Sequence, residues 1–168
     1  IIPGNRFEQT SVLLTHTMQS KGDLVVATYT DTGIAYAKKE AFLVGTVAEM
    51  NIPYQYDIHF GFPLSEVVLT PTDDGISVYI PPIRMLSDSF TVTSDVSKND
   101  FWHLLNENSY QQIINRQTEA CRNSYLNSNE YRQETCNAAC KALSSSLREW
   151  SGDENLPLTC LEKETPAK

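Results

Sequence analysis

Residues 54–62, YQYDIHFGF, alternate large apolar side chains with polar or small ones. Successive side chains of a strand point to opposite faces, so this period of two predicts a β-strand with one face in the core and the other in solvent. The core face would carry Tyr54, Tyr56, Ile58, Phe60 and Phe62. Pro63 has no backbone donor, so the strand should end there or lie at a sheet edge.

Further strands are predicted on both sides of this segment. β-branched and aromatic residues over 24–36 predict one long bent strand or two short ones, with a turn-like Asp31-Thr32-Gly33 between them. Residues 67–70 and 76–80 should form a hairpin, because Pro71-Thr72-Asp73-Asp74-Gly75 has the composition of a tight turn. Pro81-Pro82 should end the second strand, and residues 90–93 are another strand candidate.

Helical spacing of apolar residues appears near both ends of the chain. It predicts one helix over 8–21, a second from about 98–100 to 126, and a third from the polar stretch 127–130 to Ser151-Gly152. Residues 156–161 would return as a last strand. This order predicts an α+β fold: a twisted, mostly antiparallel sheet with an N-terminal helix and a C-terminal helical region packed on one face. We expect a single domain over residues 1–168, with its core over about 8–162.

Charge limits the class of partner. Thirteen basic and twenty-one acidic residues give a net charge of -8, which disfavours binding to nucleic-acid phosphates or to anionic lipid. The longest apolar runs are far shorter than the roughly 20 residues that span a bilayer. Because the sequence begins at Ile1, we expect an N-terminal signal or membrane anchor to be missing from it.

Cys121, Cys136, Cys140 and Cys160 are candidate disulfide cysteines, and four cysteines allow three pairings. Cys121 and Cys136 lie at equal distances from the polar stretch 127–130, so a helical hairpin turning there would pair them and leave Cys140 to Cys160. Alternatively, one unbroken helix would hold Cys121 and Cys136 about 22 Å apart, with all four as buried thiols. Zinc is a third possibility, but the spacing lacks a CxxC pair and a nearby histidine.

Catalytic patterns are missing from the sequence. It contains no nucleophile-elbow motif, phosphate-binding loop or dinucleotide fingerprint, so we assign no catalytic, cofactor-binding or metal-binding residues and expect no cofactor. Asp57 and His59 share a strand face about 7 Å apart, too far for a direct hydrogen bond. With Tyr79, which should face away from Ile76, Val78 and Ile80, they form a candidate binding surface instead.

Three segments carry a family resemblance: LVVATY at 24–29, YDIHFG at 56–61 and ISVYIPPIRML at 76–86. In order and spacing, over roughly residues 10–162, the chain resembles the bacterial family catalogued as domain of unknown function 4230. The resemblance implies a bacterial protein that follows an N-terminal hydrophobic segment or signal. It implies no activity.

We therefore expect an extracytoplasmic domain of the cell envelope, periplasmic or surface-exposed and anchored in the full-length protein, with a non-catalytic binding or scaffolding role. Its partner would be a protein or a small molecule, held for example at a sheet edge near Pro63 or Pro82. One alternative is a hydrolase with a site assembled from dispersed residues such as Asp57, His59 and His103. Another is a carrier of a small apolar ligand, which would need a cavity of a few hundred Å³ between sheet and helices.

Overall fold

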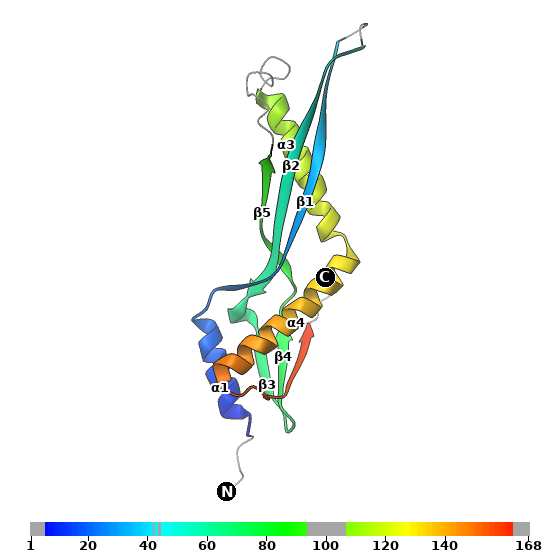
Figure 1. The fold of residues 1–168 in the computed structure, drawn as a ribbon. Helices are drawn as coiled ribbons and strands as arrows, with labels where there is room; N and C mark the ends of the chain where they lie inside the picture. The colour runs from blue at the N-terminus through cyan, green and yellow to red at the C-terminus, as the bar shows by residue number, and fades with distance from the viewer. Residues whose placement is uncertain (1–5, 42, 44, 94–106, 163–168) are drawn as a thin grey trace, which may run out of the picture. The chain divides into compact units, whose positions relative to one another are not determined.

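The computed structural model describes residues 6–41, 43, 45–93 and 107–162 (Figure 1). The α+β class is confirmed. Its elements in chain order are α1 (Glu8–Gln19), β1 (Asp23–Ala41), β2 (Gly45–Pro63), the short 3-10 helix η1 (Leu64–Glu66), β3 (Val68–Pro71), β4 (Ile76–Ile80), β5 (Arg84–Val92), α3 (Glu107–Leu126), α4 (Asn129–Ser151) and β6 (Leu158–Glu162). The helix start expected near residues 98–100 lies outside the described residues.

The described strands form two three-stranded sheets, β1-β2-β5 and β3-β4-β6, where we expected one. The division follows Pro63, because β2 ends there and the 3-10 turn at Leu64–Glu66 comes before β3. The chain divides into two compact units. The first consists of Ile1–Ala27, His59–Leu86 and Asn129–Lys168, and the second of Thr28–Ile58 and Ser87–Ser128. The expectation of a single domain over 1–168 stays a prediction.

The β3-β4-β6 sheet belongs to the first unit. β3 and β4 form the predicted antiparallel hairpin, and the N–H of Thr72 closes its turn on the carbonyl of Gly75 at 2.8 Å. β6 pairs with β4 in parallel, so β4 is the central strand. β2 is likewise central in its own sheet. The strand over 54–62 ends at Pro63, which is one of the two predicted alternatives, but it is not an edge strand. Pro82 follows β4, which is also central, so the sheet edge expected near these prolines is not found on β2 or β4.

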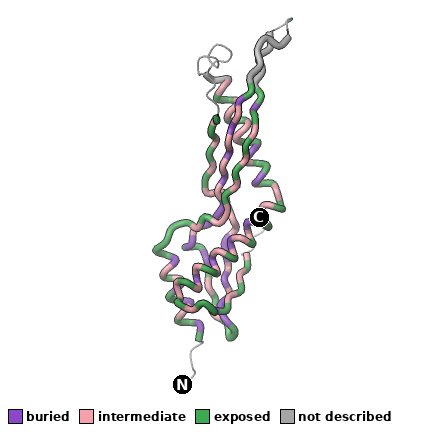
Figure 2. Tube along the Cα trace, in the orientation of Figure 1, coloured by how far each residue is buried: buried purple, intermediate pink, exposed green. Residues whose placement is uncertain are grey.

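One core fills the first unit, and α1 and α4 supply its helical side. α1 packs against β3 and α4, while α4 also packs against β6. Figure 2 shows buried positions gathered along these elements. Helix residues three or four apart share a face, and the apolar ones here meet the inward face of β4. The fully buried side chains include Leu14, Met18, Ile76, Val78, Ile80, Leu143 and Leu147.

Aromatic side chains pack the second unit. Tyr54 stacks on Phe90 with ring centroids 4.7 Å apart, and Tyr29 stacks on Tyr125 at 5.4 Å. β1 runs unbroken through Asp31-Thr32-Gly33, where we expected an interruption. The absence of a side chain at Gly33 lets Tyr54 pack directly against β1, since a Cβ on Gly33 would lie 2.5 Å from the hydroxyl of Tyr54.

Candidate functional site

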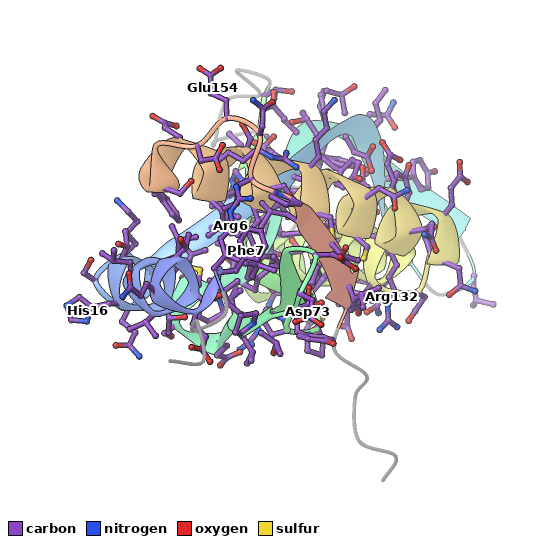
Figure 3. All side chains as sticks on the ribbon, turned by 90° about the horizontal axis from the view of Figure 1, so that it is seen from below. Arg6, Phe7, His16, Asp73, Arg132 and Glu154 are labelled. Atoms are coloured by element: carbon purple, nitrogen blue, oxygen red, sulfur yellow. A yellow bond between two sulfur atoms is a disulfide. The ribbon has the colours of Figure 1, made fainter. Side chains whose placement is uncertain are left out.

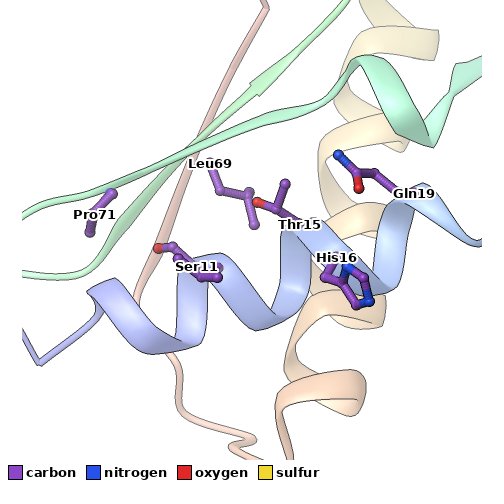
Figure 4. Close-up of a pocket in the computed structure, with 7 residues that line it drawn as sticks. Ser11, Thr15, His16, Gln19, Leu69 and Pro71 are labelled. Atoms are coloured by element: carbon purple, nitrogen blue, oxygen red, sulfur yellow. The ribbon is translucent and has the colours of Figure 1, made fainter.

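A groove in the first unit lies between α1 and β3 (Figure 4). Ser11, Thr15 and Gln19 recur every four residues along α1, so they form one stripe of the helix, and Val12 and His16 form the next. Leu69 and Pro71 close the groove from β3, where they alternate with more exposed neighbours. The groove is open to solvent and has a volume of about 320 Å³; its lining residues are Ser11, Val12, Thr15, His16, Gln19, Leu69 and Pro71.

Ser11 is the unusual member of the groove. Its residue is only 4 % exposed, yet its hydroxyl has no hydrogen-bond partner. In Figure 4 this oxygen is turned to the side of the groove on which Pro71 lies. A buried hydroxyl without a partner costs about 1–3 kcal/mol, so proteins usually pair such groups with protein atoms, water or a ligand.

The remaining lining combines apolar and neutral polar groups. Val12 is 71 % exposed although it is apolar, and Leu69 and Pro71 add hydrocarbon surface from β3. Thr15 and Gln19 offer a hydroxyl and an amide. The sole ionisable side chain of the lining is His16, which is exposed and projects to the periphery of α1 (Figure 3). The groove is therefore suited to an uncharged molecule.

Tyr79 lies on the outward face of the β3-β4-β6 sheet, as expected. The register aligns Val68, Tyr79 and Leu161 in one row across the three strands. Val68 is 45 % and Leu161 47 % exposed, whereas Tyr79 between them is half-buried. The next outward row carries the hydroxyls of Thr70, Ser77 and Thr159.

Asp57 and His59, predicted to share a strand face, belong to different units. Asp57 accepts hydrogen bonds from Thr30 Oγ1 at 2.6 Å and from Gln55 Nε2 at 3.1 Å. These bonds hold the carboxylate within the β1-β2 pair. His59 is half-buried in the first unit, and His103 lies outside the described residues.

Cys140 and Cys160 form a disulfide, with their Cα atoms 5.6 Å apart. This is one of the two bonds that a helical hairpin would give, but the other, Cys121–Cys136, is wrong because both are free thiols. Each of these thiols is held in its own unit. Cys121 is buried with Sγ 3.7 Å from the hydroxyl of Tyr54. Cys136 is half-buried, and burial raises the pKa of its thiol to about 11.

A polar network in the second unit was missed by the sequence analysis. The hydroxyl of Tyr56 donates to Asp88 Oδ2 at 2.7 Å, and Nε of Arg122 donates to the same oxygen at 2.8 Å. The hydrogen bond from Arg122 lowers the pKa of Asp88, and burial raises the pKa of Tyr56. Asp88 and Arg122 lie 34 positions apart on elements of different type, so no local pattern links them.

The groove was also missed as a site. Ser11, Thr15 and Gln19 form a polar stripe beside the buried Leu14 and Met18, and such a stripe usually faces solvent. Val12 and Leu13 could have indicated the groove, because they are apolar residues of α1 that stay exposed and do not contribute to the core.

The described residues contain neither a metal-ligand cluster nor a membrane-spanning helix. Within the described ranges, no three His, Cys, Asp or Glu side chains are grouped so that they could hold a metal ion. The described helices include none with the length and apolar character needed to cross a membrane. Comparison with protein-family models, curated proteins and solved structures finds no match to this chain.

Proposed function

We propose that this chain is a non-catalytic binding domain of the bacterial cell envelope, and that it holds a small, uncharged, partly apolar ligand in the groove between α1 and β3. The unpartnered hydroxyl of Ser11 carries this proposal. A ligand atom that hydrogen-bonds to this hydroxyl would offset the free-energy cost of its burial.

The dimensions and chemistry of the groove support a small ligand. Its volume of about 320 Å³ is at the lower end of the range for small-molecule sites. Val12, Leu69 and Pro71 would cover a short hydrocarbon portion, and Ser11 and Gln19 would orient a polar head. A net charge of -8 disfavours an anionic ligand by long-range repulsion.

The envelope location has independent support. Disulfides persist in oxidising compartments and are rare in the cytosol, so the Cys140–Cys160 bond is compatible with an exported protein. The resemblance of residues 24–29, 56–61 and 76–86 to the family of unknown function 4230 agrees with this location. Anchoring by an N-terminal segment, and scaffolding of a protein partner, stay predictions.

The hydrolase alternative is supported less well. Asp57 is engaged by Thr30 and Gln55, and the third residue of the expected site, His103, lies outside the described residues. The carrier alternative is closer to what is observed, although the groove is open and mixed in polarity rather than an enclosed apolar cavity.

Three probes with the same hydrocarbon chain and different heads test the proposal: hexanamide, hexanoate and hexylammonium. Amide chemical shifts of the full chain would be recorded during titration with each. We expect hexanamide to shift the signals of Ser11, Thr15 and Leu69, and the two charged probes to leave them nearly unchanged. The Ser11→Ala variant should bind hexanamide about fivefold more weakly, which corresponds to the loss of one hydrogen bond of about 1 kcal/mol.

Ser11→Ala should also be more stable than the natural chain without ligand, by about 1–3 kcal/mol, because it removes a buried hydroxyl that has no partner. Urea unfolding measures this difference. Ser77→Ala, on the outward face of β4, is the matched control and should leave hexanamide binding unchanged. Equal affinity of Ser11→Ala and the natural chain for hexanamide, or equal shifts with all three probes, would refute the proposed site.

A further inference from the structure

The last strand, β6, buries little of itself in the core of the first unit. Its five residues alternate between half-buried and exposed, whereas Ile76, Val78 and Ile80 of the neighbouring β4 are fully buried. In the sheet β6 pairs with β4 alone, because it is the last strand in the order β3-β4-β6, and its helical neighbour is α4 (Figure 1). An element with few buried apolar contacts can open by itself while the rest of the unit stays folded.

The chain just before β6 is fixed by other contacts. The N–H of Ile76 donates to the carbonyl of Pro157 at 3.0 Å. Nε of Arg148 on α4 donates to the carbonyl of Leu156 at 3.1 Å, and Leu156 is itself buried in the core. The backbone of Pro157 also lies so close to Gly75 that a Cβ on Gly75 would overlap its carbonyl oxygen. β6 therefore extends from a fixed point.

Beyond that point the disulfide ties β6 to α4. Cys160, in the middle of the strand, is bonded to Cys140 of the helix. Arg132 of α4 adds an ion pair with Glu162 at 3.6 Å, but the arginine is exposed, and exposed ion pairs contribute little (Figure 3). A short backbone pairing is also marginal without apolar burial. The position of β6 therefore depends mainly on the disulfide.

The disulfide can be reduced by a dithiol. Both of its cysteines are half-buried, so each keeps part of its solvent exposure. One thiolate of the reductant attacks a sulfur of the disulfide and forms a mixed disulfide, which the second thiol of the reductant then resolves. The reductant is oxidised to a disulfide, and Cys140 and Cys160 each gain one electron and one proton and become thiols.

We propose that the Cys140–Cys160 disulfide is a redox switch for the position of β6. Reduction by a dithiol releases β6 from β4 and α4 as far back as Pro157, while α1, α4 and the β3–β4 hairpin stay folded. The reduced first unit then has a two-stranded sheet, and the side of β4 that β6 had covered is accessible. This inference is independent of the α1–β3 groove.

The backbone amides of β4 provide an internal control for this release. The N–H of Ile76 points to the side of β6, since it donates to the residue just before that strand. N–H groups alternate between the two sides of a strand, so those of Val78 and Ile80 also point to β6. Those of Ser77 and Tyr79 point to β3. Release of β6 should therefore affect alternate amides of one strand.

The test is residue-resolved hydrogen exchange of the full chain, first oxidised and then reduced by dithiothreitol. We expect the amides of Val78 and Ile80 to exchange about tenfold faster or more after reduction, because the crosslink no longer opposes opening of β6. The amides of Ser77 and Tyr79 should keep their rates, since the β3–β4 pairing persists.

Variants separate the bond from the reagent. Cys140→Ser/Cys160→Ser should show the faster exchange of Val78 and Ile80 without dithiothreitol and should not respond to it. Cys136→Ser removes a free thiol from the same helix and should behave as the natural chain does in both states.

Two results would overturn the proposal. One is a disulfide that stays intact when the folded chain is incubated with dithiothreitol, as measured by intact mass after alkylation. The other is a reduced chain in which all four amides accelerate equally or none accelerates, because β6 would then not be released as a separate element.

Discussion

At the scale of single residues, Asp88 connects β5 to α3 within the second unit. Its carboxylate accepts hydrogen bonds from Tyr56 and Arg122 on one oxygen, and Tyr56 is fully buried. A carboxylate bonded to a guanidinium and a phenol is stabilised in its charged form, which explains why its pKa is lowered.

This pairing predicts a loss of stability in acid. The folded pKa of Asp88 lies below the unfolded one, so its contribution is complete above about pH 4, the ordinary range for aspartate, and is lost as the pH falls through the folded pKa. Asp88→Asn should lower the free energy of unfolding at neutral pH by about 1–3 kcal/mol. It should also flatten the dependence of stability on pH below this range, as measured by urea unfolding at several pH values.

Asp73→Asn, in the exposed β3–β4 turn, is the control for the charge change and should leave the acid profile unaltered. If Asp88→Asn and the natural chain lost stability in parallel between neutral pH and acid, the Arg122–Asp88 pair would contribute no acid sensitivity.

At the scale of elements, Gly61 sets how closely β1 approaches β2 in the first unit. A Cβ on this residue would overlap the carbonyl oxygen of Leu24 and come within 2.8 Å of a methyl carbon of Leu86. Backbone cannot rotate out of the way as a side chain can, so Gly61→Ala should force the strands apart and destabilise the chain by about 1–3 kcal/mol.

The matched control for Gly61→Ala is Gly22→Ala, because a Cβ on Gly22 would meet no atom within 4 Å. Thermal unfolding compares the two variants. Equal melting temperatures for both would show that the packing around Gly61 yields without cost.

Local patterns predicted several elements closely, and the physical reason is that each has its own boundary signal. β4 spans Ile76–Ile80 between a glycine turn and a proline pair, and α4 ends beside Gly152, whose φ of 72° suits a helix C-terminus. The full length of β1 was harder to predict, because Asp31-Thr32-Gly33 has the composition of a turn. In the structure this segment is extended and pairs within the sheet. Here tertiary packing against Tyr54 decides the conformation.

At the scale of the whole molecule, the disulfide acts through the unfolded chain. It links residues separated by 20 positions, and a crosslink of that loop length should stabilise the folded state by about 3 kcal/mol. The double variant Cys140→Ser/Cys160→Ser should unfold at correspondingly lower urea concentration, as followed by circular dichroism. Cys136→Ser removes a sulfur from the same interface and leaves the disulfide intact. It should therefore lower the free energy of unfolding much less. Equal losses in the two variants would assign the effect to packing.

The global arrangement could be predicted only in part. Local burial patterns predicted a sheet with an N-terminal helix and a C-terminal helical region packed on one face. The division into two sheets was not predicted, since strand pairing depends on contacts between distant residues. The groove could not be predicted for the same reason: Ser11 and Leu69 meet only once α1 has packed beside β3.

The parallel pairing of β4 with β6 also has a consequence for biosynthesis. β4 leaves the ribosome long before β6, and β5, α3 and α4 are made between them. Until then the hairpin partner β3 occupies one side of β4, and the donors and acceptors on its other side await a strand that does not yet exist. The nascent chain therefore passes through a stage with an open edge on its most apolar strand, a surface that chaperones recognise and on which aggregation begins.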